Sequence, residues 1–225
     1  MEIKPVAVYH SPLKEKFGLP RQAGIATALR GRVELLPEYK SGEALRGLED
    51  FDYIWLLWGF HLNREGSGEG HLTVRPPRLG GNERIGVFAS RSPYRPNPLG
   101  LSSVRIVSVL PDKGIIEVEG ADLADGTPVY DIKPYVEYAD SHCGVRSGFV
   151  DKNSWEGLEV KVQESLKDTL GENGLKAVCE LIAQDPRPRY QDDPERIYHL
   201  KYGNFDVDFK ISGKIAEIID IRKIN

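Results

Sequence analysis

Ser103-Val-Arg-Ile-Val-Ser-Val-Leu110 is followed by Pro111-Asp-Lys-Gly114 and then by Ile115-Ile-Glu-Val-Glu119. β-Branched residues dominate the first and third segments, which is typical of strands. The middle segment combines proline, aspartate and glycine, which is typical of a tight turn. The stretch from 103 to 119 therefore predicts a β-hairpin.

Further short strands are predicted on both sides of this hairpin, at Pro5–Tyr9, Val33–Leu36, Phe51–His61 and Val129–Tyr135, the last cut by Pro134. Up to this point strands do not alternate with helices. This arrangement favours a barrel or closed sheet over a doubly wound fold, so the expected fold class is mainly β.

Three local patterns refine this expectation. Phe51–His61 is the most hydrophobic segment and is predicted to be a strand buried on both faces. Ser41–Gly47 is predicted to be a short helix that Ser41 caps. Glu65–Gly70 is rich in glycine, but the third glycine of a dinucleotide-binding motif would fall at His71. We therefore interpret this segment as a mobile surface loop.

The composition changes near residues 138–156, and 141–156 is interpreted as a linker. Beyond it, apolar residues in Glu172–Gln184 repeat at helical spacing and predict an amphipathic helix. The alternation in Phe205–Ser212, with turn signals at Gly203-Asn204 and Ser212-Gly213, predicts a β-meander. The chain is thus expected to have an N-terminal domain at 1–140 and a small α+β domain at 157–225.

Bulk properties are those of a soluble globular protein. The chain has 225 residues, is 40% hydrophobic and 28% charged, and carries a formal net charge of −4. No apolar run is long enough to span a membrane, and the N-terminus has no signal-peptide pattern. Cys143 and Cys179 have neither metal-ligand nor redox spacing, so both are expected to be reduced thiols in a cytoplasmic protein.

The stretch Arg75–Gly100 contains five prolines and four glycines, so most of it is excluded from ordinary helix. Only Ile85–Ala89 reads as a short buried strand. Between Arg75 and Arg105 there are six arginines and one acid, a segment charge of +5 that leaves −9 for the rest of the chain. A stiff loop that presents guanidinium groups suits an anionic ligand. The alternative is a structural loop whose arginines pair with surface acids.

The sequence contains few generic catalytic patterns. The five histidines lack metal-ligand spacing, and no serine occupies a nucleophile elbow. The residues alone leave two function classes open. One is an enzyme that works by positioning its substrates. The other is a binding module.

Several motifs together resemble one family. They are Pro-Arg-Gln at 20–22, Arg-Pro-Pro-Arg-Leu-Gly-Gly-Asn at 75–82, Gly-Val-Phe-Ala-Ser-Arg-Ser-Pro at 86–93, Arg-Pro-Asn-Pro-Leu-Gly-Leu-Ser at 95–102, Asp-Gly-Thr-Pro-Val at 125–129 and Asp-Ile-Lys-Pro-Tyr at 131–135. The chain is similar to the TsaA-like, TrmO-type family of S-adenosylmethionine-dependent tRNA methyltransferases. Gln184-Asp-Pro-Arg-Pro-Arg-Tyr190 resembles the start of that family's small C-terminal domain.

The resemblance implies a single-sheeted β-barrel, a homodimer, and methylation of N6 of threonylcarbamoyladenosine at position 37 in the tRNA anticodon loop. It implies S-adenosylmethionine as the cofactor and no metal. By position it assigns cofactor binding to Arg21, Gln22, Ala23, His61, Leu62, Arg91, Leu101, Leu123, Ala124, Asp125 and Gly126. Leu62 departs from the family's glutamine, so any contact there is expected from backbone or apolar packing.

Two further sets of residues follow from this interpretation. Asp131 is the candidate acceptor for the N6 proton and Lys133 the candidate partner of the threonyl carboxylate; the alternative is a structural turn. RNA contacts are expected from Arg75, Arg78, Arg95, Arg187 and Arg189. The competing functions are a cofactor-responsive RNA-binding protein and a methyltransferase for another small nucleophile.

Overall fold

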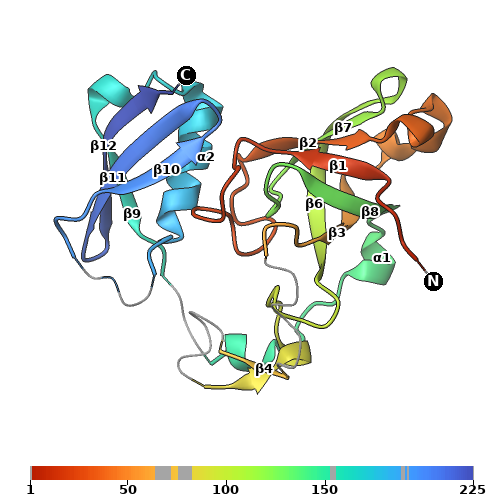
Figure 1. The fold of residues 1–225 in the computed structure, drawn as a ribbon, viewed down its shortest axis with the longest axis horizontal. Coiled ribbons are helices and arrows are strands. Elements are labelled where there is room, and N and C mark those ends of the chain that lie inside the picture. Colours follow the sequence, from red (N-terminus) through yellow and green to blue (C-terminus); the bar gives the residue numbers. More distant parts are fainter. Residues whose placement is uncertain are drawn as a thin grey trace.

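The computed structural model describes residues 2–63, 72–75, 83–152, 156–188, 191 and 193–224. Two lobes lie side by side (Figure 1). The larger lobe is a barrel formed by the N-terminal part of the chain, and the smaller is a sheet covered by a helix. No helix among the described residues is both long and apolar enough to cross a membrane.

The barrel is a single closed antiparallel sheet in the order β1-β2-β7-β6-β3-β8. Its strands are β1 (Ala7–His10), β2 (Arg30–Leu35), β3 (Tyr53–Gly59), β6 (Leu99–Leu110), β7 (Ile115–Glu119) and β8 (Thr127–Pro134). The hairpin predicted at 103–119 is confirmed as β6 and β7, joined by the 3₁₀ turn η5 (Pro111–Lys113). The mainly β expectation is confirmed.

Strand β3 corrects the prediction that 51–61 is buried on both faces. Ile54, Leu56 and Trp58 point into the barrel core, whereas Trp55 and Leu57 are only half-buried. Successive side chains of a strand point to opposite faces, and the outer face of a closed barrel has no second layer to cover it.

Other local predictions also need correction. Ile85–Ala89 is not one strand: β5 (Ile85–Gly86) pairs with β4 (Thr73–Val74), and η4 (Val87–Ala89) follows as a 3₁₀ turn. Ser41–Gly47 forms only the 3₁₀ turn η2 (Gly42–Leu45), and Ser41 makes no side-chain cap. Strand β8 runs on to Pro134 without being cut, because Pro134 occupies its last position, where no further ladder bond is needed.

The remaining short helices lie in the connections. They are η1 (Pro37–Tyr39), η3 (Leu48–Asp50), α1 (Glu137–Asp140), η6 (Gly148–Val150) and η7 (Glu164–Leu166). The expected loop at Glu65–Gly70 lies outside the described residues.

The second lobe is a four-stranded sheet in the order β10-β11-β12-β9. Its elements are β9 (Glu159–Val162), α2 (Gly171–Ala183), β10 (Tyr198–Tyr202), β11 (Phe205–Ser212) and β12 (Ile215–Lys223). The predicted helix and meander are confirmed, and Gly203 and Gly213 adopt positive φ in the two turns. Strand β9 was not foreseen; it pairs parallel with β12, a contact between residues far apart in the sequence.

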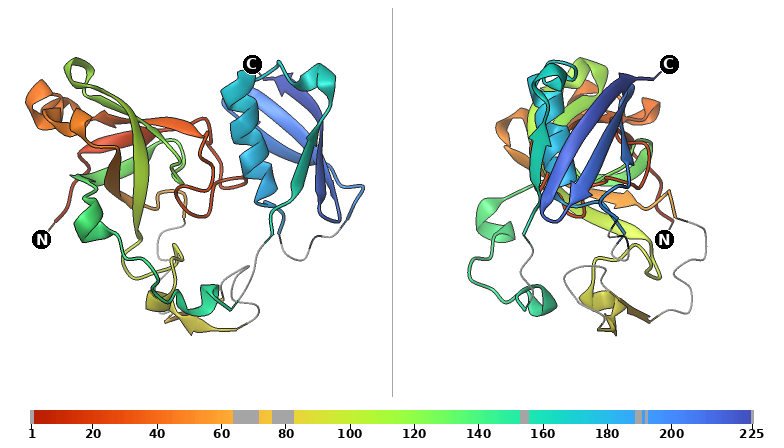
Figure 2. Two further views of the ribbon diagram at one scale, coloured as in Figure 1. Left: turned by 180° about the vertical axis from the view of Figure 1, so that it is seen from behind. Right: turned by 90° about the vertical axis from the view of Figure 1, so that its left-hand side faces the viewer.

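The two longest connections between barrel strands leave the same end of the barrel. The loops β1–β2, β3–β6 and β7–β8 all leave one end, since every strand pair in the barrel is antiparallel. The first two span residues 11–29 and 60–98. Figure 2 shows the β1–β2 loop, in red, reaching from the barrel to α2. Loops at this end therefore meet both the barrel and the second lobe.

Gly100 provides a test of the packing in the barrel. A Cβ at Gly100 would lie 2.2 Å from Cε2 of the buried Trp58 ring, whereas one at Gly86 would meet nothing within 4 Å. We expect Gly100→Ala to lower the free energy of unfolding by about 1–3 kcal/mol, as overpacking does. Gly86→Ala, the matched control, should change it by less than about 0.5 kcal/mol. Urea unfolding of both variants measures the difference, and equal stabilities would contradict this packing.

Candidate functional site

Two residues that the resemblance assigned to cofactor binding meet where the long loops gather. The Arg91 guanidinium donates from Nη1 to Oε1 of Gln22, across 69 positions of sequence. Gln22 belongs to the β1–β2 loop and Arg91 to the β3–β6 loop. Arg91 is exposed, so its guanidinium has further donors available for an anionic group.

The β7–β8 loop is bound to the β1–β2 loop from several sides. Gly24 N donates to Gly120 O at 2.8 Å, and Asp125 N donates to Leu13 O at 2.8 Å. The Asp125 carboxylate accepts from Ser11 N at 3.0 Å. These bonds fix the backbone of 120–126 against the loop that carries Gln22, so the two predicted cofactor segments form one surface.

His61 extends this surface from the end of β3. Thr127 Oγ1 donates its only proton to Ala124 O at 2.8 Å. It must therefore accept from His61, whose Nδ1 lies 3.2 Å away. This arrangement assigns the neutral ring a proton on Nδ1 and leaves Nε2 as an acceptor. Nε2 is the closest atom, at 3.9 Å, to a Cβ built on Gly126.

A pocket lies beside His61 and is lined by Ile3, Gly59, Phe60, His61, Asn97, Pro98, Leu99, Pro128 and Tyr130. Of the residues predicted to bind cofactor, only His61 lines it. A second pocket lies between the β1–β2 loop and the end of α2, with Lys16, Arg21, Leu181 and Pro186 in its walls. Neighbouring residues Arg21 and Gln22 thus line different parts of the surface.

Asp122 and Ser102 belong to the site but were missed from the sequence. Ser102 Oγ accepts from Trp58 Nε1 at 2.9 Å and donates to Asp122 Oδ1 at 2.5 Å. Burial raises the pKa of the Asp122 carboxyl, while the Ser102 bond and the Arg91 charge oppose this rise. The family resemblance singled out only 123–126 in this segment; the signal for Asp122 was its place between the apolar Ala121 and Leu123.

Some predicted contacts are limited to backbone. Leu123 and Ala124 are buried at 0% and 5% exposure, and Leu123 belongs to the barrel core, so their side chains are not accessible to a ligand. Leu62 and Leu101 are both exposed. Leu101 points to the outer face of the barrel, where its register partner is Leu57.

Asp131 and Lys133 also lie on this outer face. Asp131 pairs with Leu57 and Lys133 with Trp55, so Leu57 separates Asp131 from Leu101 by one strand. Lys133 Nζ is 3.2 Å from Asp131 Oδ2; the Lys133 side chain is largely exposed, whereas that of Asp131 is about half-buried. The structure does not bring this pair into contact with Gln22 or Arg91 among the interactions of the described residues.

The arginines predicted to contact RNA have different surroundings. Arg75 is exposed beside β4, and Arg95 donates from Nη1 to Ser90 O at 3.2 Å. Arg187 is only 11% exposed and forms a two-point ion pair with Asp185 at 2.9 and 3.1 Å. That pair holds the turn after α2, where Asp185 has a φ of 50°. Arg78 and Arg189 lie outside the described residues.

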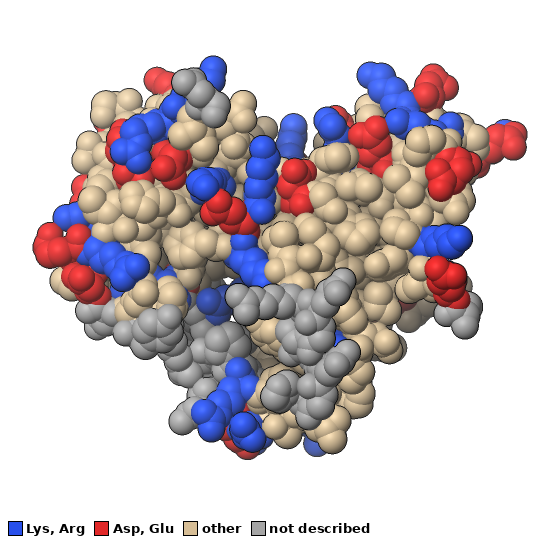
Figure 3. Space-filling model, viewed as in Figure 1, with Lys and Arg blue, Asp and Glu red and all other residues tan. Residues whose placement is uncertain are grey.

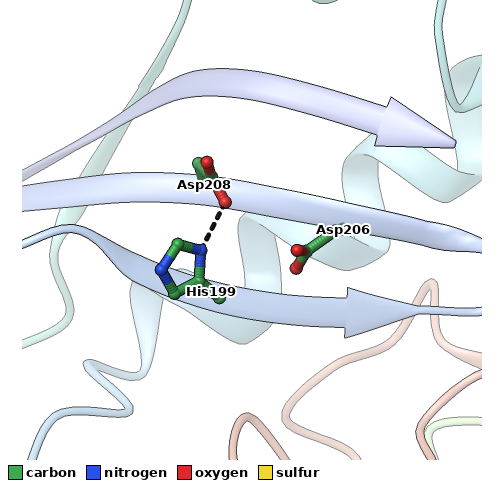
Figure 4. A group of neighbouring side chains, drawn as sticks. All are labelled: His199, Asp206 and Asp208. Atoms are coloured by element: carbon green, nitrogen blue, oxygen red, sulfur yellow. Dashed lines mark hydrogen bonds and ion pairs between the residues drawn. The ribbon is translucent and has the colours of Figure 1, made fainter. Parts of the chain in front are cut away.

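One group of potential metal ligands occurs among the described residues. Ligand atoms of His199, Asp206 and Asp208 all lie within 4.8 Å of one another, on β10 and β11 (Figure 4). His199 Nδ1 is 2.6 Å from Asp208 Oδ1. The Arg222 guanidinium lies 2.9 Å from Asp208 and 3.5 Å from Asp206. Because Arg222 and His199 already pair with these carboxylates, we interpret this group as an ion-pair network on the outer face of the sheet.

Two family models match the chain in succession. The tRNA-methyltransferase O N-terminal domain matches residues 8–141, and the TrmO C-terminal domain matches residues 156–224. The chain belongs to the tRNA-methyltransferase O family. The family model for the N-terminal domain covers the barrel and its long loops, and that for the C-terminal domain covers the sheet with α2.

Relatives and solved structures agree with this family over nearly the whole chain. The chain is 37% identical over 227 residues to the tRNA (adenine(37)-N6)-methyltransferase of Escherichia coli K12, covering 96% of each chain. It is 44% identical over 213 residues to a putative S-adenosylmethionine-dependent methyltransferase, RcsF, of Pseudomonas aeruginosa, covering 91% of this chain and 90% of that one. The crystal structure of TrmO from Pseudomonas aeruginosa matches with a TM-score of 0.80 and 32% identity, covering 99% and 98% of the two chains.

The raised pKa of Asp122 leads to a prediction about stability. A carboxyl whose pKa is higher in the folded than in the unfolded state favours folding most in acid, and this contribution is lost as pH rises through its folded pKa. Asp122→Asn keeps an acceptor for Ser102 without the charge. We therefore expect the variant to be at least as stable as the parent protein at pH 7.

The difference between the two proteins should shrink as pH falls toward about 4, the ordinary range for a carboxyl. Urea unfolding of both proteins between pH 4 and 8 measures it. A variant that is less stable at pH 7, with a gap that grows with pH, would contradict the raised pKa.

Proposed function

We propose that this protein transfers a methyl group from S-adenosylmethionine to N6 of adenine 37 in tRNA, and that the adenine carries a threonylcarbamoyl group. Membership of the tRNA-methyltransferase O family supports the reaction class, and relatives similar in sequence are named tRNA (adenine(37)-N6)-methyltransferase. The observation that carries the proposal is the convergence of Gln22, Arg91 and Asp122 from three different loops.

The residues at this convergence fit the cofactor. Arg91 would bind its carboxylate, since a guanidinium is the preferred partner of that group. Asp122 would accept from its ammonium or ribose hydroxyl groups. The backbone of Leu123–Gly126 and the ring of His61 would complete the rim. When bound, the cofactor supplies an electrophilic methyl carbon on a sulfonium. The closed barrel needs no glycine-rich dinucleotide motif, which agrees with the absence of one from the sequence.

The protein's own contribution would be positioning. N6 of the modified adenine is a poor nucleophile, because its lone pair is shared with the purine and the ureido carbonyl. Holding it in line with the methyl carbon removes much of the entropic barrier. Asp131 would accept the departing proton and Lys133 would hold the threonyl carboxylate. Both roles require the Asp131–Lys133 ion pair to open when tRNA binds.

The RNA-facing surface would include the exposed arginines near the β4–β5 hairpin. Arg75 directly follows β4, and Arg84 directly precedes β5. Figure 3 shows lysines and arginines gathered over this part of the molecule and along the junction of the two lobes. We include Arg95 and the undescribed Arg78 and Arg189 in this proposal. An anticodon loop already exposes its bases, so no duplex need be opened.

The wider biological setting is part of the same proposal. The division into domains at 1–140 and 157–225, with a linker between them, is supported by the ranges of the two family models. A homodimer is suggested by exposed apolar side chains such as Phe88, 76% exposed, and Leu101, 61% exposed. A tRNA substrate would place the enzyme in the cytoplasm, away from membranes.

The decisive experiment gives the purified protein S-adenosylmethionine and two tRNA samples that differ only in the threonylcarbamoyl group. Nucleoside mass analysis should find a new methyl group on the modified tRNA alone. Methylation of both samples would show that the threonylcarbamoyl group is not required, and only the proposal of methyl transfer to adenine 37 would remain. Cofactor and RNA binding without methylation would favour the RNA-binding alternative, and methylation of another nucleophile alone would favour the second alternative.

Asp131→Asn tests the proposed proton acceptor. The amide has nearly the shape of the carboxylate but is not basic, so we expect kcat to fall by about 10²- to 10⁴-fold. Affinity for S-adenosylmethionine should stay the same, because Asp131 lies away from the Gln22–Arg91 contact. Single-turnover methylation and calorimetric titration measure the two quantities. Unchanged turnover would exclude Asp131 from this role.

Arg75→Ala tests the RNA-facing surface. Loss of one phosphate contact should weaken tRNA binding and reduce the slope of log K against log salt by about one unit. Arg46→Ala is the matched control, because Arg46 pairs with Glu43 in η2, at the end of the barrel opposite the long loops. Filter binding between 50 and 300 mM salt, roughly the range over which phosphate contacts are weakened, measures both slopes. Identical slopes for Arg75→Ala and the parent protein would exclude this contact.

A further inference from the structure

Glu180 of α2 binds two consecutive residues of the β1–β2 loop. Its Oε1 accepts from Thr27 Oγ1 at 2.9 Å, and its Oε2 accepts from Ala28 N at 2.8 Å. The partners are more than 150 positions apart in sequence. Because each carboxylate oxygen has its own donor, the bond fixes the direction of the loop as well as its distance from α2.

Apolar anchors hold the same loop on both sides of its middle. Leu13, Ala26 and Leu29 are buried in the core formed by α2 and the second sheet. Phe17 stacks on Tyr198 with ring centroids 6.4 Å apart. A Cβ at Gly18 would lie 2.2 Å from Leu200 Cδ1, so the loop backbone is packed directly on β10.

The cofactor-facing part of the loop lies between these anchors. Gln22 and Ala23 are half-buried, and Gly24 and Ile25 are exposed. This part contacts the barrel through the Gly24–Gly120 backbone bond and the Gln22–Arg91 bond. Its position therefore depends on the flanking anchors, of which the Glu180 contact begins three residues after Gly24.

We propose that Glu180 is a positioning residue for the cofactor site: by holding Thr27 and Ala28, it keeps Gln22 in place to bind Arg91 before the cofactor arrives. This inference rests on the proposed function. It assigns to the C-terminal domain a part in binding the methyl donor, in addition to any contact with tRNA. Preordering the loop lowers the entropy that binding must otherwise overcome.

The packing of α2 does not itself require Glu180. The stripe that faces the sheet consists of Ala177, Val178, Leu181 and Ile182, all nearly fully buried. Glu180 lies outside this stripe and extends to the loop. Removing its carboxylate therefore leaves the core of the second lobe intact and loosens mainly the loop.

The test compares four variants of the full-length protein. Glu180→Ala removes both bonds. Glu180→Gln keeps an oxygen for Ala28 N and an amide that can donate to the Thr27 hydroxyl. Lys176→Ala, an exposed position one turn earlier on α2, is the control. Thr27→Ala removes one of the two bonds without touching α2, so it still tests the contact if Glu180→Ala folds poorly.

Two measurements are made without tRNA. Calorimetric titration with S-adenosylmethionine should show Kd raised about tenfold in Glu180→Ala, by a smaller factor in Thr27→Ala, and by less than about twofold in Glu180→Gln and Lys176→Ala. Hydrogen exchange on the cofactor-free protein should show faster exchange at Gly24 N, which bonds Gly120 O, only in Glu180→Ala and Thr27→Ala. With modified tRNA, KM for the cofactor should rise while kcat at saturation stays nearly constant.

The outcomes separate the two proposals. If the parent protein binds no S-adenosylmethionine, the proposed function is wrong. If the parent binds it and Glu180→Ala binds equally well, with unchanged exchange at Gly24, the positioning role is wrong and the proposed function stands. Equal loss of affinity in Glu180→Gln and Glu180→Ala would also overturn the role as stated here, since it would show that the charge and not the hydrogen bonds matters.

Discussion

The packing of the β1–β2 loop against α2 is the interaction on which the arrangement of this protein depends. The loop starts and ends in barrel strands, yet Leu13, Ala26 and Leu29 are buried in the core of the second lobe. Apolar burial of this kind is the main source of stability in both lobes. The β1–β2 loop is thus part of the barrel and also part of the core of the second lobe. The position of the second lobe therefore affects the position of Gln22, which this loop carries to Arg91.

Closure of the barrel explains why the site consists of loops. A closed antiparallel sheet has no free edge to which a ligand could bind, and side chains fill the interior of this barrel. Ligand-binding groups must come from the ends or from the outer face. Three connections leave the same end, two of them long, and hydrogen bonds such as Asp125 N to Leu13 O join them to one another. The fold thus replaces the helix N-terminus of a doubly wound enzyme with a set of mutually bonded loops.

The β6–β7 hairpin and most barrel strands could be predicted from the sequence, because alternation and turn residues are local signals. The other strand pairings of the barrel join segments with no such turn between them, and they were not predicted. The failures are of another kind. Phe51–His61 looked buried on both faces, since composition does not tell how many layers a sheet has. Strand β9 was missed because four residues carry too weak a pattern, and only its pairing with β12 makes it a strand.

For the candidate site as well, the sequence supplied some residues, whereas their contacts and burial came only from the structure. Motif resemblance supplied Gln22 and Arg91, but only the fold shows that they touch. Asp122 was passed over because its role depends on Ser102, twenty positions away. Arg187 was expected to be available to RNA, but its pairing with Asp185 leaves it nearly buried. Sequence reveals which residue types are present, whereas burial and partners decide which of them are free to act.

Asp122 shows how the site's electrostatics favour a cationic ligand. Burial disfavours the charged form of this carboxyl, and the Ser102 bond and the Arg91 charge only partly offset the effect, since its pKa remains raised. A positive ligand group beside Asp122 would relieve the remaining desolvation penalty, whereas a neutral ligand would not. Arg91 makes the complementary demand for an anionic group. A ligand that carries an ammonium, a sulfonium and a carboxylate together meets both demands, and this matches the charges of S-adenosylmethionine better than those of a nucleotide phosphate.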